Sequence, residues 1–253
     1  PVSVVAALLG VPPAQHGEVC ALVAAFVAGV APGASADRIE KANGAADGLL
    51  DILTPLVPAR SGDVLPILRV AAVSASPAAV VANALGFLFQ THDATAGLVG
   101  NTLLAAARDR NAYRRALDEG RPWDFVNEVQ RFDPPVHNTR RFLAADITVE
   151  GHTMRAGETV LVVLAAANHD EKANAAPARF DIDRVDRRSF TFGAGRHACP
   201  GEIIATAVAA VAAELLAPRL AEPDWLAERV SYRALPNVRI PVFGGRNAQG
   251  EVR

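Results

Sequence analysis

One cysteine, Cys199, lies in a glycine-containing segment near the end of the sequence, where residues 192–201 read Phe-Gly-Ala-Gly-Arg-His-Ala-Cys-Pro-Gly. An apolar, alanine-rich stretch follows up to Leu216, which predicts a helix that starts at the cysteine with Pro200 at its first helical position. A helix N-terminus favours the thiolate, which is the metal-binding form of cysteine. The glycines, which leave room for a flat ligand to approach, are Gly193, Gly195 and Gly201. The segment therefore indicates a metal–thiolate bond.

The surroundings of Cys199 favour one kind of metal. A structural zinc site needs about four ligands. His197 and Cys199 supply two at most, and no second Cys/His pair stands near them in the sequence. A single thiolate suits a haem iron, because the porphyrin supplies four further ligands. The alternative is a buried structural cysteine, which is common for a lone thiol.

These residues resemble the haem-binding signature of the cytochrome P450 family, Phe-x-x-Gly-x-(Arg/His)-x-Cys-x-Gly. Every fixed position is matched, by Phe192, Gly195, His197, Cys199 and Gly201. The resemblance implies a thiolate-ligated haem b with Cys199 as the axial iron ligand, His197 on a propionate and Phe192 packed beneath the iron. The full set of implied haem-binding residues is Phe192, Gly193, Gly195, His197, Cys199, Gly201 and Arg141.

A second motif, Glu128-Val-Gln-Arg131, resembles the Glu-x-x-Arg helix of the same family. Alone, such a pair at this spacing is usually an exposed ion pair of small energy. In the family it is buried and bonded to an arginine of a later loop, and Arg179 fits that place. The resemblance also implies a propionate-binding arginine after this helix. Arg141 aligns best with it, and Arg140 lies one register away.

A third segment departs from the family. An Ala/Gly-Gly-x-Asp/Glu-Thr motif normally lies in a long helix over the oxygen-binding face of the haem, and here the aligned residues are Gln-Thr-His-Asp-Ala at 90–94. Asp93 keeps the acid, whereas Thr91 replaces a glycine and Ala94 replaces the threonine that takes part in proton delivery. Thr95 is displaced by one position, which rotates its side chain by about a hundred degrees. The predicted catalytic residues are therefore Thr91, Asp93, Ala94 and Thr95, and Thr91, ordered water or a substrate hydroxyl is expected to take over the missing role.

The composition agrees with a helix-rich protein that has a sizeable core. The chain has 253 residues, of which 51% are hydrophobic, and its net charge of −2 gives no electrostatic footprint for nucleic acid. The two cysteines, Cys20 and Cys199, are far apart, which disfavours a disulfide framework and favours the cytoplasm. No signal peptide is recognised, and the longest uncharged run, Val70–His92, is predicted to be a buried helix and not a membrane span.

The spacing of apolar residues and the positions of Pro and Gly predict the helices and strands that carry these motifs. Helices are expected at 1–10, 18–30, 35–53, 77–110, 111–117, 123–132 and 199–216, strands at 139–163 and 230–243, and an irregular segment at 168–188. The predicted fold class is mainly α with small β-sheets, as in the C-terminal part of the cytochrome P450 fold. The apolar start at Pro1 suggests that residues 1–253 form one haem domain lacking its N-terminal portion, with weak or absent haem retention.

The resemblance implies a soluble, bacterial-type monooxygenase that inserts one oxygen atom of O2 into a small organic substrate. Electrons are expected from a ferredoxin with its reductase or from a flavin reductase, with no nucleic acid or membrane partner. Two alternatives remain open because of residues 90–94. One is a peroxide-driven peroxygenase, and the other is a haem-thiolate homologue that binds or docks without catalysis.

Overall fold

The computed structural model describes residues 1–57, 76–216 and 224–244. Within these ranges the chain is mainly helical, with three two-stranded antiparallel sheets, as the sequence predicted. It divides into two compact units, Pro1–Ala96 and Gly97–Arg253, with the division inside one long helix, α5 (Pro77–Arg108). Each unit is described by itself.

The first unit is helical. It contains α1 (Val2–Leu8), α2 (His16–Val30), α3 (Ala36–Leu53) and the first part of α5, with single 3-10 turns at Pro13–Gln15 and Thr54–Leu56. Chain signals explain two of the boundaries. Gly10 adopts a positive φ of 82° directly after α1, and the Ser35 side chain accepts a hydrogen bond from the Arg38 backbone N–H at 3.4 Å before α3.

One apolar cluster forms the core of this unit. Its innermost residues, each 2% exposed or less, are Ala6, Leu9, Val19, Val23, Leu49, Leu53, Val80, Ala84 and Leu88. Phe26 and Phe89 meet edge to face at its margin, with ring centroids 5.4 Å apart. The helix predicted over the uncharged run is confirmed from residue 77 to 92, whereas residues 70–75 lie outside the described part.

In the described residues, one helical stretch, Pro13–Val30, is long and apolar enough to cross a membrane by length and composition. Only 17% of it is buried. A core helix of a soluble protein and a signal sequence meet the same criteria, so this stretch is weak evidence for a membrane segment.

The second unit holds the end of α5 and five further described helices. These are α6 (Arg110–Asp118), α7 (Pro122–Phe132), α8 (Leu164–Asn168), α9 (Glu202–Leu216) and α10 (Asp224–Glu228). Asp109 caps α6 by accepting a hydrogen bond from the Ala112 backbone N–H at 2.9 Å. Pro122 occupies the first position of α7, where a missing N–H costs nothing.

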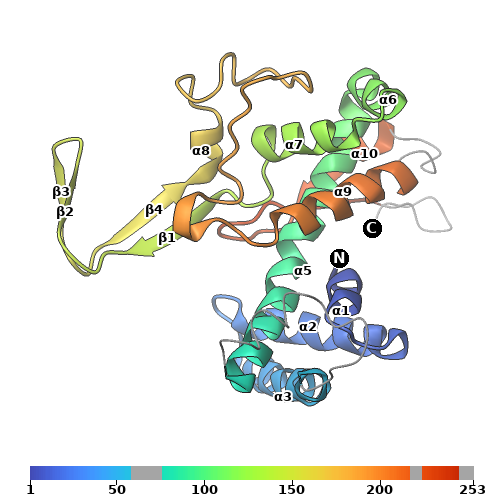
Figure 1. Ribbon diagram of the computed structural model, residues 1–253, viewed down its shortest axis with the longest axis vertical. Coiled ribbons are helices and arrows are strands. Elements are labelled where there is room, and N and C mark those ends of the chain that lie inside the picture. The colour runs from blue at the N-terminus through green and yellow to red at the C-terminus, as the bar shows by residue number, and fades with distance from the viewer. Residues whose placement is uncertain (58–75, 217–223, 245–253) are drawn as a thin grey trace. The chain divides into compact units, whose positions relative to one another are not determined.

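Three antiparallel strand pairs complete this unit. Strand β1 (Asn138–Phe142) pairs with β4 (Thr159–Val163), and β2 (Ile147–Val149) forms a hairpin with β3 (His152–Met154). Figure 1 shows that β1 and β4 form a ribbon that carries the β2–β3 hairpin at its far end. The third pair, β5 (Val230–Tyr232) and β6 (Pro241–Phe243), comes from the end of the described chain. The predicted strands at 139–163 and 230–243 are thus confirmed.

Helix α7 contributes Phe125, Val126 and Val129 to the apolar core of the second unit. Phe125 is 1% exposed and packs edge to face on Tyr113 of α6 and on Phe180 of the loop after α8. The Tyr113 hydroxyl donates to the Ala213 carbonyl of α9 at 2.7 Å, and burial raises the pKa of this phenol. The helix therefore has a fixed position between α6, α9 and the loop that contains Phe180.

Two predicted details are wrong. Helix α9 begins at Glu202 and not at Cys199, so Pro200 precedes the helix. The Ala205 N–H donates to the Gly201 carbonyl at 2.9 Å, which makes Gly201 the N-cap residue that precedes the helix. The short helix α8 was not expected, because five residues are too few for a periodic pattern.

Candidate functional site

The segment around Cys199 folds into a closed loop. The Cys199 backbone N–H donates to the Phe192 carbonyl at 2.7 Å, which joins the two ends of the eight-residue stretch 192–199. Between them, Gly195–His197 forms a single 3-10 turn, with the Ala198 N–H donating to the Gly195 carbonyl at 3.0 Å. The loop is therefore defined by its own backbone hydrogen bonds.

Glycine is required at one position of this loop for steric reasons. Gly193 has φ +74°, and a Cβ there would lie 2.8 Å from the His197 carbonyl oxygen. Gly195 has φ +61°, but a Cβ added there would meet nothing within 4 Å, so only its backbone conformation favours glycine. At Gly201 a Cβ would meet Cys199 Sγ at 3.6 Å, an ordinary contact.

The loop presents its cysteine on an open surface. Cys199 is partly exposed and His197 is exposed, whereas the Phe192 ring packs against the apolar core of the second unit. In the described residues, no group of three or more His, Cys, Asp or Glu side chains could hold a metal ion. The donor set is therefore a single accessible sulfur beside an open backbone surface, which fits a flat macrocycle that brings its own metal ligands.

Below the loop, Glu128 and Arg131 form a buried ion pair on α7. Neither side chain has any exposed surface, and Arg131 Nη2 donates to Glu128 Oε1 at 2.7 Å while Nε reaches both carboxylate oxygens at 3.1 Å. The remaining Arg131 donors bond to the carbonyls of Asn168, Pro177 and Arg179. The pair thus links α7 to the loop that leads to the cysteine.

The third member of this network is Arg187 and not Arg179, which corrects the prediction. Arg187 Nε donates to Glu128 Oε2 at 3.0 Å, and Arg184 Nε lies 3.5 Å from Oε1. Arg179 contributes only its backbone carbonyl, because its side chain is 74% exposed and points to Asp181. Sequence position did not separate these arginines, since four lie within ten residues of one another.

A second network, missed from the sequence, anchors the residues just before the loop. The buried Asn168 side chain donates to Thr191 Oγ1 at 2.9 Å and accepts from the Phe190 N–H at 2.6 Å, and Thr191 Oγ1 donates to the Gln130 carbonyl at 2.6 Å. Gln130 Nε2 donates to Thr206 Oγ1 of α9 at 2.7 Å. Both flanks of the cysteine loop are therefore tied to α7. Four ordinary polar residues in separate elements carry no motif that sequence reading detects.

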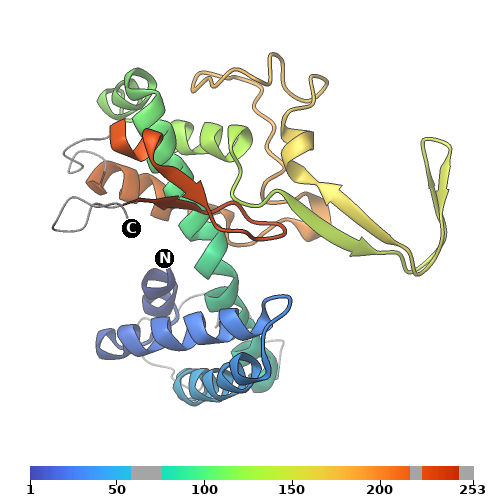
Figure 2. The same cartoon turned by 180° about the vertical axis from the view of Figure 1, so that it is seen from behind.

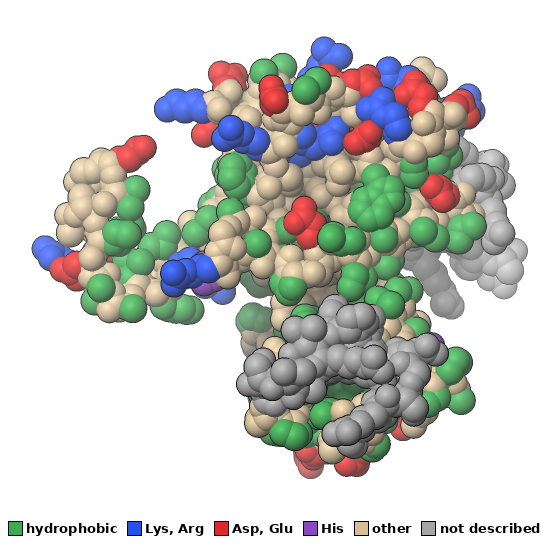
Figure 3. Space-filling model, in the orientation of Figure 1, with side chains coloured by type: hydrophobic (Ala, Val, Ile, Leu, Met, Phe, Trp, Pro, Cys, Tyr) green, Lys and Arg blue, Asp and Glu red, His purple; other side chains and the backbone are tan. Residues whose placement is uncertain are grey.

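Charged side chains cover the surface above these networks, where acidic and basic groups alternate around α6 and the loop after α8 (Figure 3). Asp183 bonds to Arg121 Nη1 at 2.8 Å and also to Arg115. The hydrogen bonds from Arg121 and Arg115 lower the pKa of the Asp183 carboxyl. Arg121 Nη2 further donates to the Ile182 carbonyl at 3.3 Å, which Arg187 also contacts, at 3.0 Å.

The arginines proposed for the propionate lie on β1. Arg141 is partly buried and pairs in register with Val160 of β4, and its Nη1 donates to Thr139 Oγ1 and to the Arg140 carbonyl, both at 2.8 Å. Arg140 is exposed. Successive residues of a strand point to opposite faces, so only one of the two can serve the same ligand.

The predicted catalytic residues form one helical segment of the first unit, in α5. Thr91 and Thr95 are one turn apart, with their hydroxyl oxygens separated by 3.4 Å, and Thr95 is 5% exposed. Asp93 Oδ1 lies 2.9 Å from His92 Nδ1. Thr91, Asp93 and Ala94 are each partly exposed. The segment thus combines a hydroxyl pair with an acid that is held by its neighbouring imidazole.

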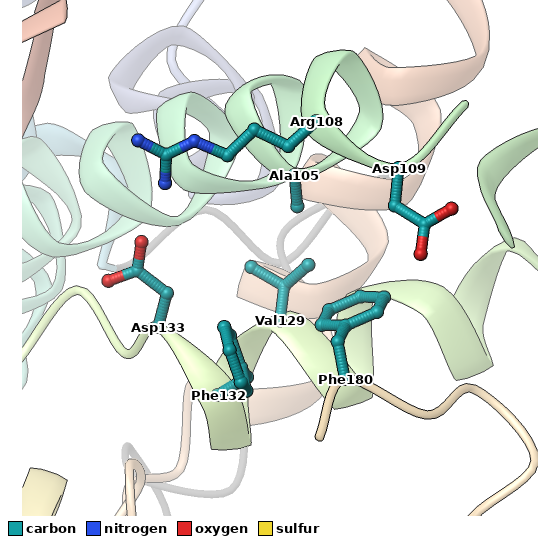
Figure 4. A pocket seen from close by; sticks show the side chains of 7 residues that line it. All are labelled: Ala105, Arg108, Asp109, Val129, Phe132, Asp133 and Phe180. Atoms are coloured by element: carbon teal, nitrogen blue, oxygen red, sulfur yellow. The ribbon is translucent and has the colours of Figure 1, made fainter. Parts of the chain in front are cut away.

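A small cavity of about 100 Å³ lies elsewhere in the second unit, between the end of α5 and α7 (Figure 4). Ala105, Val129, Phe132 and Phe180 form its apolar wall, and Arg108, Asp109 and Asp133 line it with charge. None of the predicted haem-binding or catalytic residues lines it. The cavity is therefore separate from the cysteine loop.

Comparison with known proteins gives this geometry a context. The sequence model described as Cytochrome P450 matches residues 124–216, which include Glu128, Arg131 and the whole cysteine loop. Vitamin D(3) 25-hydroxylase of Pseudonocardia autotrophica is 34% identical over 213 residues, covering 81% of this chain and 52% of that protein. Cytochrome P-450 monooxygenase DoxA of Streptomyces sp. (strain C5) is 33% identical over 226 residues, covering 81% of this chain and 51% of that protein. The chain spans about half the length of these curated relatives.

The fold agrees with these sequence matches. The ligand-free structure of cytochrome P450 TbtJ1 superimposes with a TM-score of 0.83 at 27% identity, covering 97% of this chain and 68% of that one. CYP164A2 of Mycobacterium smegmatis gives a TM-score of 0.73 at 29% identity, covering 96% and 65%. The cysteine loop, the buried Glu128–Arg131 pair and the relatives lead to one conclusion. The chain belongs to the cytochrome P450 family.

Proposed function

We propose that this chain carries the haem-thiolate part of a monooxygenase that inserts one atom of O2 into a small organic molecule. The observation that carries the proposal is the accessible Cys199 in a backbone-closed loop, anchored on α7 through Glu128 and Arg131. The names of the relatives, a 25-hydroxylase and a monooxygenase, support the same reaction class.

The residues present fit a haem b. Cys199 would ligate the iron, Phe192 would support the ring from the core side, and the exposed His197 and the β1 residue Arg141 would bind propionates. When bound, a thiolate-ligated haem supplies the oxygen-activating chemistry, which the protein itself does not provide. Gly193 and Gly195 keep the loop backbone in the conformation that leaves the sulfur accessible.

The role assigned to the α5 segment is proton supply. Ala94 has no hydroxyl, so the neighbouring groups able to hold a proton are the Asp93 carboxyl and the Thr91–Thr95 hydroxyl pair. Thr91 is the better placed hydroxyl, because on a helix position 91 lies about 60° from position 94, whereas position 95 lies about 100° away. Thr95 would orient the Thr91 hydroxyl. The Asp93 carboxyl would take up a new proton from solvent after each transfer.

The partners follow from the reaction. A monooxygenase needs two electrons for each turnover, and a ferredoxin with its reductase or a flavin reductase is the proposed donor. The proposed substrate is a small organic molecule, and the proposed location is the cytoplasm. A bacterial relative named as a vitamin D(3) hydroxylase supports an apolar substrate class without specifying the compound.

The two cysteines allow a matched test of the iron ligand. In the natural full-length protein, Cys199→Ser should abolish the carbon monoxide difference band of a thiolate-ligated ferrous haem, because a hydroxyl does not replace the thiolate. Cys20→Ser, in the partly buried Cys20 of α2, should leave that band intact. A Cys199→Ser protein with an unchanged band would overturn the assignment.

A peroxide-driven reaction is the second candidate, and Ala94 is the residue that favours it. Turnover with hydrogen peroxide but not with a reduced ferredoxin would select this candidate. Ala94→Thr gives an independent test of the proposed proton supply. If Thr91 already performs it, the variant should convert electrons to product no better than the wild type, and a large gain in coupling would contradict the proposal.

A further inference from the structure

Two segments separated by a hundred residues of sequence form one joint in the second unit. Residues 135–138, which lead from α7 into the start of β1, lie antiparallel to residues 236–239, between β5 and β6 (Figure 2). Val136 and Val238 form a β-bridge, the His137 N–H donates to the Asn237 carbonyl at 2.8 Å, and the Arg239 N–H donates to the Pro135 carbonyl at 2.7 Å. The backbones of both segments are thus fixed to each other.

An ion pair closes one end of this joint. Arg239 Nη1 donates to Asp133 Oδ1 at 2.8 Å, and the two side chains are 35% and 15% exposed. The guanidinium carbon of Arg239 lies 3.9 Å from the centroid of the Tyr232 ring. Asn101 of α5, which is 1% exposed, donates to the Asp133 carbonyl at 2.8 Å. Contacts from four elements therefore hold this pair in place. By contrast, two exposed side chains must lose conformational entropy when they form an ion pair.

Glycines of α5 show how closely the joint is packed. A Cβ on Gly97 would lie 2.9 Å from Pro135 Cβ and 3.1 Å from the Arg239 carbonyl oxygen. A Cβ on Gly100 would lie 2.5 Å from Pro241 Cγ. The joint and the adjoining Pro241 therefore pack directly against α5, with no space for a side chain at Gly97 or Gly100.

By resemblance to the cytochrome P450 family, residues 136–138 and 236–238 correspond to loops that contact substrate in that family. We propose that Asp133 and Arg239 are positioning residues, whose ion pair sets the relative position of these two loops and so the shape of the substrate pocket wall. The inference rests on the proposed function. Neither residue needs to touch the substrate, since each acts through the loop that it holds.

The test uses two probes that bind haem iron and differ in size. Imidazole binds the iron with little contact to the pocket wall, whereas 4-phenylimidazole also places an apolar ring against it. In the haem-loaded natural full-length protein, Arg239→Gln and Asp133→Asn should each weaken 4-phenylimidazole binding about tenfold, the size of one lost apolar contact in a pocket. Imidazole affinity should stay unchanged. The two substitutions should not add in the double variant, because either one breaks the same pair.

A matched control is available on the β2–β3 hairpin. Arg155 and Asp146 also form an ion pair, at 2.6 Å, but their side chains are 69% and 52% exposed. Arg155→Gln should change the affinity of neither probe. Arg239→Lys, which keeps the charge, should recover part of the 4-phenylimidazole affinity, and it decides the question if the glutamine variant does not fold.

The outcomes separate this inference from the function on which it rests. Variants that fold, show the thiolate carbon monoxide band and bind both probes like the wild type would overturn the positioning role alone. Equal weakening of both probes would also overturn it, because that result indicates a general loss of structure around the haem. A wild type without the thiolate band would instead refute the proposed function.

Discussion

The Glu128 carboxylate gives the sharpest test of the anchoring network. It has no exposed surface and accepts hydrogen bonds from Arg131 at 2.7 and 3.1 Å, from Arg187 at 3.0 Å and from the Asp181 N–H at 3.0 Å. Glu128→Gln keeps the shape and removes the charge. An amide NH2 would also face at least one arginine N–H, which replaces an attraction by a donor–donor repulsion.

The expected loss of unfolding free energy follows from the burial of both partners. Removing one member of a buried ion pair costs about 3–5 kcal/mol, because the other charge is left uncompensated. Arg131 keeps carbonyl acceptors at Asn168, Pro177 and Arg179, so the lower end, about 3 kcal/mol, is expected. For a chain of this size that corresponds to a fall in melting temperature of roughly 6–12 °C.

Urea unfolding of the isolated chain measures this loss. Circular dichroism follows the helices, and tryptophan fluorescence adds a local probe because Trp123 lies in α7 itself. The matched control is Asp146→Asn, the same carboxylate-to-amide change in an exposed pair with Arg155, which should leave the midpoint unchanged. A Glu128→Gln protein with the wild-type midpoint would refute the reasoning.

Three further changes test the cysteine loop and two titrating groups. Gly193→Ala should destabilise the protein by about 1–3 kcal/mol in urea unfolding, and more than Gly195→Ala, because only the first Cβ collides with the His197 carbonyl. Burial lowers the pKa of His137, so the stability that this residue adds to the folded state is present above about pH 6.5. That stability is lost as the pH falls toward the lowered pKa of the folded state, and His137→Asn should flatten the dependence of the urea midpoint on pH in this range. Hydrogen bonds from Arg121 and Arg115 lower the pKa of Asp183, so the stability that this carboxylate adds to the folded state is present above about pH 4 and is lost below it. Asp183→Asn should therefore reduce the fall of the urea midpoint at acid pH. An unchanged fall would contradict the role given to Asp183.

The helices could be predicted because their signals are local. Ser35, Pro122 and Gly10 mark boundaries through caps and backbone angles that involve only neighbouring residues. The start of α9 was placed too early because Pro200 suits a first helical turn as well as the residue before it. Only the hydrogen bond from Ala205 to Gly201 decides between these positions, and a sequence does not contain it.

The site residues also differ in whether their position follows from spacing in the chain or from the path of a distant loop. Cys199 and the Glu128–Arg131 pair could be found because the family fixes their spacing in the chain. The third partner of Glu128 is set by the path of the irregular loop after α8, where a shift of a few residues exchanges one arginine for another. Arg179 was therefore predicted and Arg187 is found.

One helix explains how a short loop can hold a ligand in place. Along α7, Glu128 binds the loop after α8, Gln130 binds α9 through Thr206, and the Gln130 carbonyl receives Thr191 just before the loop. The stretch 192–199 is thus fixed at one end through Thr191 and at the other through α9, while its own closing bond joins Phe192 to Cys199. A ligand bound to that sulfur would be positioned by α7, although no side chain of α7 is predicted to touch it. Substitutions on α7 should therefore alter ligand geometry at Cys199 without altering the ligand's chemical identity.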